Sequence, residues 1–194
     1  MATSNILEIN KDLYLGKGGT KRVYLHPEDD GLCIKFPRLE KPRRKLGLLR
    51  EIKYLEKHQD ALPFLSKYVG TIATDLGTGY LYTTIKNEDG TPSAGIAKFL
   101  KETKGTPKNL EKKIESIYNQ LLERRAVIND SSLSNIFIRK KESGDYDIYL
   151  IDGFGNSEFI KISDYSKFFL KKKLNRKFKK LFWRLKISDH FLNS

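Results

Sequence analysis

Two carboxylates and a side-chain amide in the second half of the chain are placed where they could form a metal and phosphate site. Asp130 and Asn135 occupy the two ends of the polar cluster in VINDSSLSNIFI, and Asp152 follows the apolar run YDIYLI. Mg²⁺ prefers oxygen ligands of these types and shares them with nucleotide phosphates. A polar cluster between apolar runs is also an ordinary turn. This stretch by itself leaves both interpretations open.

A glycine-rich segment and a lysine near the N-terminus could contact phosphates. Gly16 and Gly18 lie between two strand-like runs, and Val23 lies in the second run. Glycines allow close approach of the backbone and leave amides free to point at phosphate oxygens. Lys35, in the run LCIKF, could reach over this segment to a nucleotide. The alternatives are a flexible hairpin turn and a lysine that faces solvent.

The helix expected after Lys35 carries two carboxylates that could hold the lysine ammonium in position. They are Glu51 and Glu56. A lysine that contacts nucleotide phosphates is typically oriented by such a helical glutamate. We favour Glu51 because Glu56 lies nearer the helix end, with surface solvation as the alternative for both.

The pattern of apolar residues predicts an α+β fold. Short apolar runs between 6 and 38, then at 66–75 and 79–86, predict strands, with a helix over 43–62 between them. Further helices are expected over 94–103 and from Asn109 onward. The runs NIFIRK and YDIYLI predict a β-hairpin, and the chain beyond about 163 is expected to be helical.

A polar linker divides this sequence into two parts. Residues 87–93 (NEDGTPS) hold a glycine and a proline and separate a strand-rich half from a helical one. We therefore expect a first lobe over 1–86, a hinge over 87–93 and a second, smaller lobe over 94–194.

Cysteine use and hydropathy favour a cytoplasmic protein. The only cysteine, Cys33, lies in an apolar run and is expected to be buried and inert. The N-terminus has no signal-peptide pattern, and no apolar run approaches the ~20 residues of a membrane span. The three histidines have no metal-ligand spacing.

The net charge of +13 is concentrated in a C-terminal segment. Ten lysines and arginines lie between Lys167 and Lys186 without one acidic residue. Apolar residues recur there at helical spacing, so the segment could pack on the second lobe with its basic face in water. It could also lie on an anionic membrane surface, with Trp183 and the phenylalanines at the interface and the protein peripheral to the inner membrane. Nucleic acid is disfavoured, because charge is the only feature that supports it.

The order of these motifs is that of protein kinases. The chain is similar to the YrbL-type PhoP regulatory network proteins, through LGKGGTKRVYLHP, CIKFPR, DGTPS, NDSSLSNI and LIDGFG. This resemblance runs from about Leu15 to the basic tail. The YrbL-type proteins are in turn similar to bacterial kinases that phosphorylate the lipopolysaccharide core.

The resemblance implies a bilobal protein-kinase-like fold, with a β-rich first lobe and a small helical second lobe, that binds ATP and Mg²⁺. Asp130 would take the proton of a substrate hydroxyl, and Asn135 and Asp152 would bind the metal. Lys35, paired with Glu51, would contact the α- and β-phosphates. The residues implied to cover the phosphates are Gly16, Gly18 and Val23.

Departures from the kinase pattern keep a second function open. Lys21 stands where a third glycine is usual, and Ile128 and Asn129 replace the usual His-Arg before the catalytic aspartate. The short remainder after Asp152 leaves little room for an activation loop, and a peptide-substrate platform is not expected, which resembles sugar and small-molecule kinases. The resemblance then implies a sugar hydroxyl of a lipopolysaccharide precursor as the acceptor. The alternative is a pseudokinase, a regulatory protein that binds nucleotide or a partner without turnover.

Overall fold

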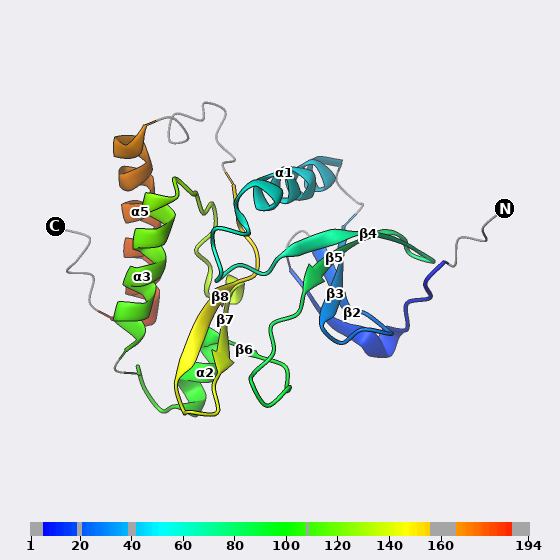
Figure 1. Cartoon of the computed structure of the whole chain (residues 1–194), viewed down its shortest axis with the longest axis horizontal. Helices are drawn as coiled ribbons and strands as arrows, with labels where there is room; N and C mark the ends of the chain where they lie inside the picture. The colour runs from blue at the N-terminus through cyan, green and yellow to red at the C-terminus, as the bar shows by residue number, and fades with distance from the viewer. Residues whose placement is uncertain (1–5, 19–20, 39–41, 108, 156–165, 188–194) are drawn as a thin grey trace. The chain divides into compact units, whose positions relative to one another are not determined.

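The computed structural model describes residues 6–18, 21–38, 42–107, 109–155 and 166–187, with no side chains described over 42–45. The protein is α+β, and its strand pairs within the sheets are antiparallel (Figure 1). The chain forms two compact units. Unit 1 comprises Met1–Glu56 and Ser66–Thr84, and unit 2 comprises Lys57–Leu65 and Ile85–Ser194.

Unit 1 is built on a five-stranded sheet in the order β1-β2-β3-β5-β4. A short 3₁₀ turn, Lys11–Leu13, leads into it. The strands are β1 (Tyr14–Lys17), β2 (Lys21–Leu25), β3 (Leu32–Pro37), β4 (Tyr68–Thr74) and β5 (Gly77–Thr83). They correspond to runs expected from apolar alternation, and consecutive strands are joined by hairpins except where the helix α1 (Pro42–His58) intervenes between β3 and β4.

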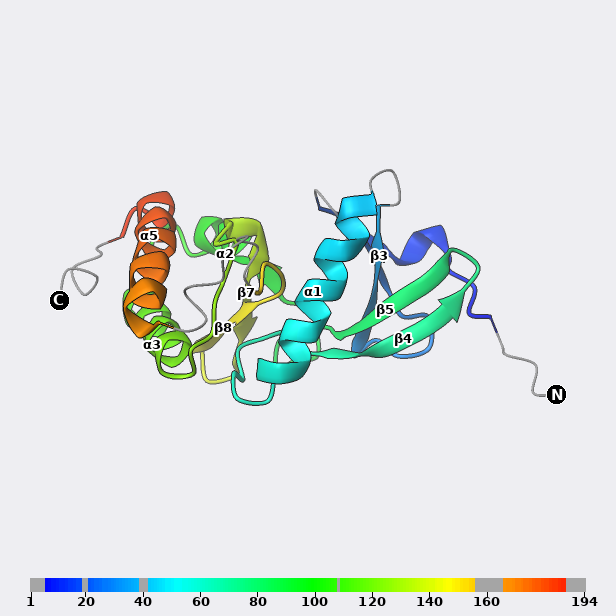
Figure 2. The ribbon, with the colours of Figure 1, turned by 90° about the horizontal axis from the view of Figure 1, so that it is seen from above.

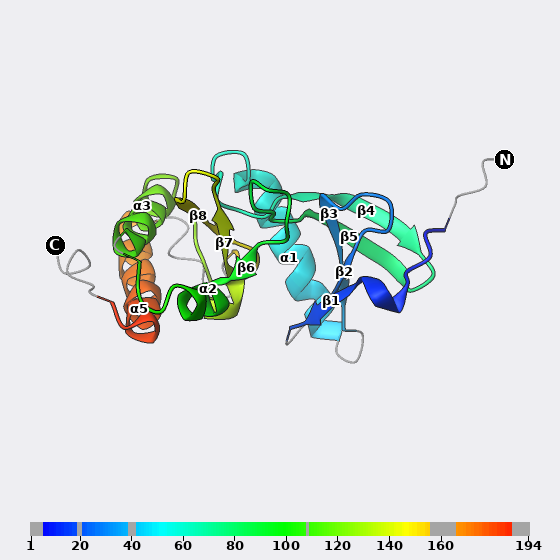
Figure 3. The same ribbon diagram turned by 90° about the horizontal axis from the view of Figure 1, so that it is seen from below.

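The two faces of β3 have different neighbours. Ile34 and Phe36 point to one face, where they form a core with Ile9. The alternate residues Cys33 and Lys35 therefore point to the other face. Helix α1 lies against that face, as its hydrogen bond to β2 shows (Figures 2 and 3). Cys33 is buried there, as predicted, and burial raises the pKa of its thiol, which disfavours the reactive thiolate.

The segment ILEIN does not form the expected strand. Leu7 makes one isolated parallel bridge to Thr74, and the Ile9 amide donates to the side chain of Asp75 at 2.9 Å. A side-chain acceptor thus replaces the next backbone partner, so the ladder does not continue. Ile9 and Leu7 contribute to the core without belonging to the sheet, whereas Ile6 is exposed.

Unit 2 combines a small sheet with helices. The sheet order is β6-β7-β8, and β7 and β8 form the predicted hairpin, from Ile136 opposite Leu150 to Lys140 opposite Tyr146. A 3₁₀ turn, Leu133–Asn135, precedes β7. The other elements are β6 (Ala94–Gly95), α2 (Ile96–Glu102), α3 (Leu110–Glu123), β7 (Ile136–Lys140), β8 (Tyr146–Leu150) and α5 (Lys167–Leu185).

The basic helix α5 is a core element of unit 2. It packs beside α3, with the ring of Tyr118 edge-on to Phe178 at 5.1 Å between centroids (Figure 1). Tyr118 also donates a hydrogen bond to the Asn175 side chain. The residues that α5 buries are Leu170, Lys173, Leu174, Phe178, Leu181, Phe182 and Leu185. Removing α5 would therefore expose the core of this unit.

Residues 57–65 join unit 2 through β8. The Leu150 amide donates to the Phe64 carbonyl at 2.8 Å, and Leu65 bridges Leu150. The boundary between the two units at 84/85 lies next to the expected hinge. Residues 57–65, in contrast, belong to unit 2, although the sequence placed them in the first lobe. Among the described residues, no helix is both long and apolar enough to cross a membrane.

Candidate functional site

A backbone ladder in unit 2 joins the two polar motifs of the sequence. The amides of Asn129 and Asp130 donate to the Gly153 carbonyl at 2.7 and 3.2 Å, and Ile128 pairs with Phe154. Farther along, the Ile151 amide donates to the Asn135 carbonyl at 3.0 Å. These bonds hold the segment that carries Asp152 against the loop that carries the other two predicted residues.

The side chains of this loop are ordered by hydrogen bonds. The Asn135 Nδ2 donates to Asp130 Oδ2 at 3.2 Å, and the Ser132 amide donates to Asp130 Oδ1 at 3.0 Å. The Gly153 amide donates to Asp152 Oδ1 at 2.9 Å. The Asp130 carboxylate is exposed, so a ligand can reach it. The structure therefore brings together two of the predicted residues by direct contact and the third through its neighbour Gly153.

Only glycine fits at position 153. Its φ is +84°, and a Cβ there would lie 2.7 Å from the Asp130 carbonyl oxygen and 3.2 Å from the Asn135 Nδ2. Both the backbone conformation and the space exclude a side chain. The Asp-Gly pair thus allows the close approach of the two segments that places the acids together.

The donor set suits a divalent cation shared with a phosphate. Two carboxylates, Asp130 and Asp152, and the Asn135 amide lie in this region, but no group of three or more His, Cys, Asp or Glu among the described residues could hold a metal. Mg²⁺ commonly takes one or two protein carboxylates and completes its shell with water and substrate phosphates. Asp130, Asn135 and Asp152 are residue types that would fit part of such a shell.

Helix α5 contributes contacts to this loop that the sequence analysis did not assign. Lys177 Nζ donates to the Asn129 carbonyl, and Arg184 Nη1 donates to the Ser131 carbonyl at 3.2 Å. In return, the Ser131 hydroxyl donates to the Lys177 carbonyl at 3.0 Å. These bonds bracket Asp130 on both sides. The helix is therefore part of the frame that holds the candidate site.

Lys177 is a cation at an apolar position of its helix. It lies one turn after Leu174 and one turn before Leu181, both of which are buried. Burial lowers the pKa of its ammonium, the nearby Arg176 acts in the same direction, and Asp130 opposes them. A lysine inside the apolar stripe was the sequence signal that Lys177 faces the rest of unit 2. The signal was not recognised because the segment contains ten basic residues.

The residues predicted to bind phosphates in unit 1 align across three strands. Gly16 of β1 lies opposite Val23 of β2, and Val23 lies opposite Lys35 of β3. The Gly18 amide donates to the Lys21 carbonyl at 3.0 Å, next to the turn. Residues 19 and 20 of the glycine segment lie outside the described residues. The strand register thus places these motifs in one row.

Lys35 does not face solvent. Its side chain is buried, and Nζ lies 3.9 Å from the centroid of the Tyr82 ring. Cation–π contact of this kind is favourable for a desolvated ammonium. The alternative of a simple surface lysine in an alternating strand is therefore wrong.

Glu51 is buried, and Glu56 is exposed. Lys21 Nζ donates to Glu51 Oε1 at 2.6 Å, and the two side chains are 7% and 8% exposed. Lys21 lies two residues before Val23, so both side chains point to the same face of β2. This spacing was a sequence signal for an inward-facing lysine, and it was missed because position 21 was compared only with a glycine. The pairing of Glu51 with Lys35 remains a prediction.

Comparison with known proteins identifies the family. The model of the family described as PhoP regulatory network protein YrbL matches residues 7–186. The chain belongs to the YrbL family. The uncharacterized protein YrbL of Escherichia coli (strain K12) is 26% identical over 180 residues, which cover 90% of this chain and 86% of that protein. Uncharacterized protein YrbL of Shigella flexneri has the same identity and coverage.

The match spans both groups of residues described above. In this YrbL-family chain it includes the row from Gly16 to Lys35 and the ladder between Asn129 and Gly153. It extends over the whole of α5, so the contacts of Lys177 and Arg184 also lie within it. The basic helix is therefore part of the family domain and not an appended tail.

Proposed function

We propose that this YrbL-family chain is an ATP- and Mg²⁺-dependent phosphotransferase of the protein-kinase-like superfamily, with two lobes. The observation that carries the proposal is the ladder between 127–130 and 151–155, which gathers Asp130, Asn135 and Asp152 in unit 2. The row of Gly16, Val23 and Lys35 in unit 1 adds support from an independent part of the chain.

The chemistry proposed is transfer of the γ-phosphoryl group of ATP to an alcohol. The bond from the γ-phosphorus to the bridging oxygen breaks, a bond to the acceptor oxygen forms, and ADP leaves. Asp130 accepts the hydroxyl proton, and the Asn135 amide donor keeps that carboxylate oriented. Asn135 and Asp152 would hold Mg²⁺, which neutralises phosphate charge when bound. Lys35, positioned by Glu51, would contact the phosphates of the nucleotide.

The acceptor proposed is a sugar hydroxyl of a lipopolysaccharide precursor on the cytoplasmic side of the inner membrane. Comparison of the lipopolysaccharide core by mass spectrometry, from cells with and without the gene, tests this acceptor. A loss of one phosphate in the deletion supports it, and identical core masses would reject it.

Mg·ATP is expected to stabilise the protein against heat. At a concentration a hundredfold above Kd, ligand binding adds about 2.7 kcal/mol, which corresponds to a rise in Tm of about 5–10 °C for a chain of this size. Asp152→Ala should lose most of this shift. The matched control is Asp147→Ala, which removes a half-exposed carboxylate paired with Lys141 on the hairpin surface. Equal shifts in the two variants would reject Asp152 as a metal ligand.

A non-catalytic regulatory protein is the second candidate. Ile128, in the position of the usual histidine, is a core residue at 3% exposure, and the Asn129 carbonyl is bound by Lys177. The two residues before Asp130 thus contribute to the core and to the contact with α5. Measurable ATP turnover that Asp130→Asn abolishes would exclude this candidate, whereas Mg·ATP binding without turnover would favour it.

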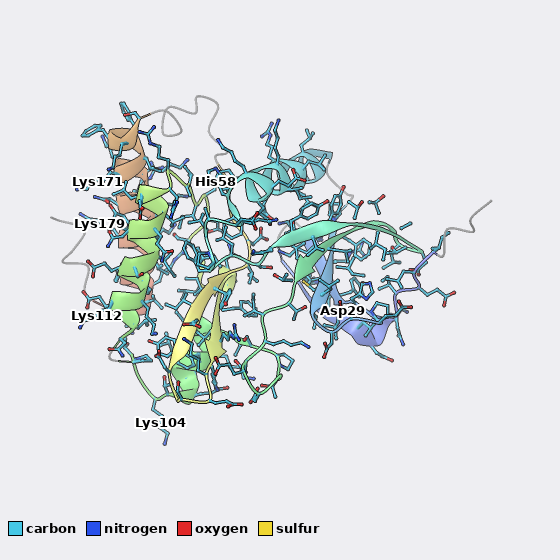
Figure 4. The ribbon with its side chains drawn as sticks, in the orientation of Figure 1. Asp29, His58, Lys104, Lys112, Lys171 and Lys179 are labelled. Atoms are coloured by element: carbon cyan, nitrogen blue, oxygen red, sulfur yellow. The ribbon has the colours of Figure 1, made fainter. Side chains whose placement is uncertain are left out.

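A peripheral position at an anionic membrane is proposed for the outer face of α5. Phe168, Phe169 and Trp183 are exposed at 71%, 46% and 77%. The exposed cations between them are Lys171, Lys172, Arg176, Lys179 and Lys180. Figure 4 shows Lys171 and Lys179 on the side of α5 turned away from β7 and β8. Aromatic groups flanking cations on one helix face suit the interface of an anionic bilayer.

Neutralising part of this face is expected to weaken membrane binding. Each lysine or arginine near an anionic surface contributes about 1 kcal/mol, so replacing Lys172, Arg176 and Lys179 with glutamine should lower vesicle partitioning on the order of a hundredfold. Co-sedimentation with vesicles of equal parts phosphatidylglycerol and phosphatidylcholine measures it. Unchanged partitioning of the variant, or equal binding to pure phosphatidylcholine, would contradict the proposal.

A further inference from the structure

A hollow in unit 2 adjoins the loop that carries Asp130. Its volume is ≈ 780 Å³, within the range of small-molecule sites. Ser132 and Leu133 form one side, directly after the Asp130–Ser131 pair. The other side is the last turn of α5 and the residues that follow it, with Trp183, Arg184 and Lys186 in the lining. We refer to this hollow as the α5 groove.

The α5 groove is tied to the candidate base by hydrogen bonds. The amide of Ser132, a lining residue, donates to Asp130 Oδ1 at 3.0 Å. Arg184, on the opposite side, donates to the Ser131 carbonyl at 3.2 Å. Both walls therefore hold fixed positions relative to the Asp130 carboxylate, which is itself exposed. Asp130 is not itself a lining residue, so a molecule in the groove would lie beside the loop that carries it.

The lining selects for an anionic molecule with an apolar face. Two of its residues, Arg184 and Lys186, are cations, and none is acidic. Arginine and lysine bind phosphate and carboxylate groups through charge-assisted hydrogen bonds. Trp183 offers its indole ring, which is 77% exposed, as a flat apolar surface. The C–H face of a sugar ring matches such a surface, and a phosphate on the ring matches the cations.

We propose that the α5 groove binds a phosphorylated sugar, which is the acceptor or the part of the acceptor next to the reacting hydroxyl. Its placement as acceptor rests on the phosphotransferase function proposed above, but the binding itself does not. The acceptor of this site is therefore already anionic before the transfer, and a neutral sugar is a poor ligand.

Trp183 makes the groove observable, because it is the only tryptophan in the chain. Titration of the full chain with glucose 6-phosphate, without nucleotide, is expected to change Trp183 emission in a saturable way, and glucose should have little effect. Lys186→Gln should weaken binding by about tenfold, the usual loss for a hydrogen bond to a charged group. Calorimetry on the same samples detects binding that leaves the emission unchanged.

The matched control is Lys112→Gln, which removes the same charge from the exposed face of α3. It should bind glucose 6-phosphate as the unaltered chain does. No binding by either method, or equal loss in the two variants, would overturn the inference. So would inorganic phosphate binding as tightly as glucose 6-phosphate, or a response to anionic vesicles or oligonucleotides only. Since the titration contains no ATP, its failure would leave the Mg·ATP result intact, and the reverse also holds.

Discussion

Replacing Glu51 with alanine is expected to lower the free energy of unfolding of unit 1 by about 3–5 kcal/mol, the usual cost of removing one partner of a buried ion pair. Glu51 Oε1 lies 2.6 Å from Lys21 Nζ, and both side chains are more than nine-tenths buried. Without the carboxylate, the Lys21 ammonium has lost this partner in a low-dielectric environment. Helix α1 would also lose its polar anchor to β2.

The measurement should report on unit 1. Trp183 belongs to unit 2, so its fluorescence follows the wrong part of the chain. Hydrogen exchange of the β2 and β3 amides in increasing urea gives the stability of the sheet directly. Glu56→Ala, on the exposed side of the same helix, should change stability by no more than about 0.5 kcal/mol.

A double variant separates charge burial from packing. Lys21→Met with Glu51→Leu replaces the ion pair by apolar side chains, which is often neutral or stabilising. We expect it to recover most of the loss seen for Glu51→Ala. Equal costs for Glu51→Ala and Glu56→Ala would show that the buried pair does not hold α1 on the sheet.

Gly153→Ala is expected to lower the free energy of unfolding of unit 2 by about 2–5 kcal/mol, from positive-φ strain and forced displacement of neighbours. The added Cβ would lie 2.7 Å from the Asp130 carbonyl oxygen, a backbone atom that cannot rotate away. The ladder must therefore open at the candidate site. The stabilisation by Mg·ATP should be lost together with the stability.

Gly144→Ala is the matched control for this effect. Gly144 has a φ of +81° against +84° for Gly153, lies in the same unit, and has nothing within 4 Å of its Cβ position. It carries the backbone strain alone and should cost about 1–2 kcal/mol with the Mg·ATP effect kept. Trp183 emission in urea suits both variants because it reports on unit 2. Equal costs would show that the approach of Gly153 to Asp130 is not tight.

The types of most elements were predictable because they depend on local patterns. Alternation of apolar residues predicted β2, β3 and the β7–β8 hairpin, and helical spacing predicted α3 and α5. Polar residues between or directly after apolar runs also stand out locally, as in VINDSSLSNIFI and YDIYLID. The three polar residues of unit 2 could therefore be named from the sequence.

The tertiary structure was needed to show which side chains contact each other and which segments belong to each unit. The apolar stripe marks Lys177 as a lysine on the packed face of α5, but nothing local identifies the Asn129 carbonyl as its partner, because the loop and the helix are far apart in the chain. Likewise, the hydrogen bond from Leu150 to Phe64 draws 57–65 into unit 2 against the local composition.

The sequence by itself determined the α+β class, the candidate residues and the amphipathic basic helix. Only the tertiary structure decided that Lys21 contacts Glu51, that ILEIN packs into a core without forming a strand, and that α5 holds the Asp130 loop. The periodicity of apolar residues determines which face of a helix or strand is buried against the rest of the protein. The register between distant segments fixes which side chains meet, and that register results from long-range packing that no short stretch of sequence contains.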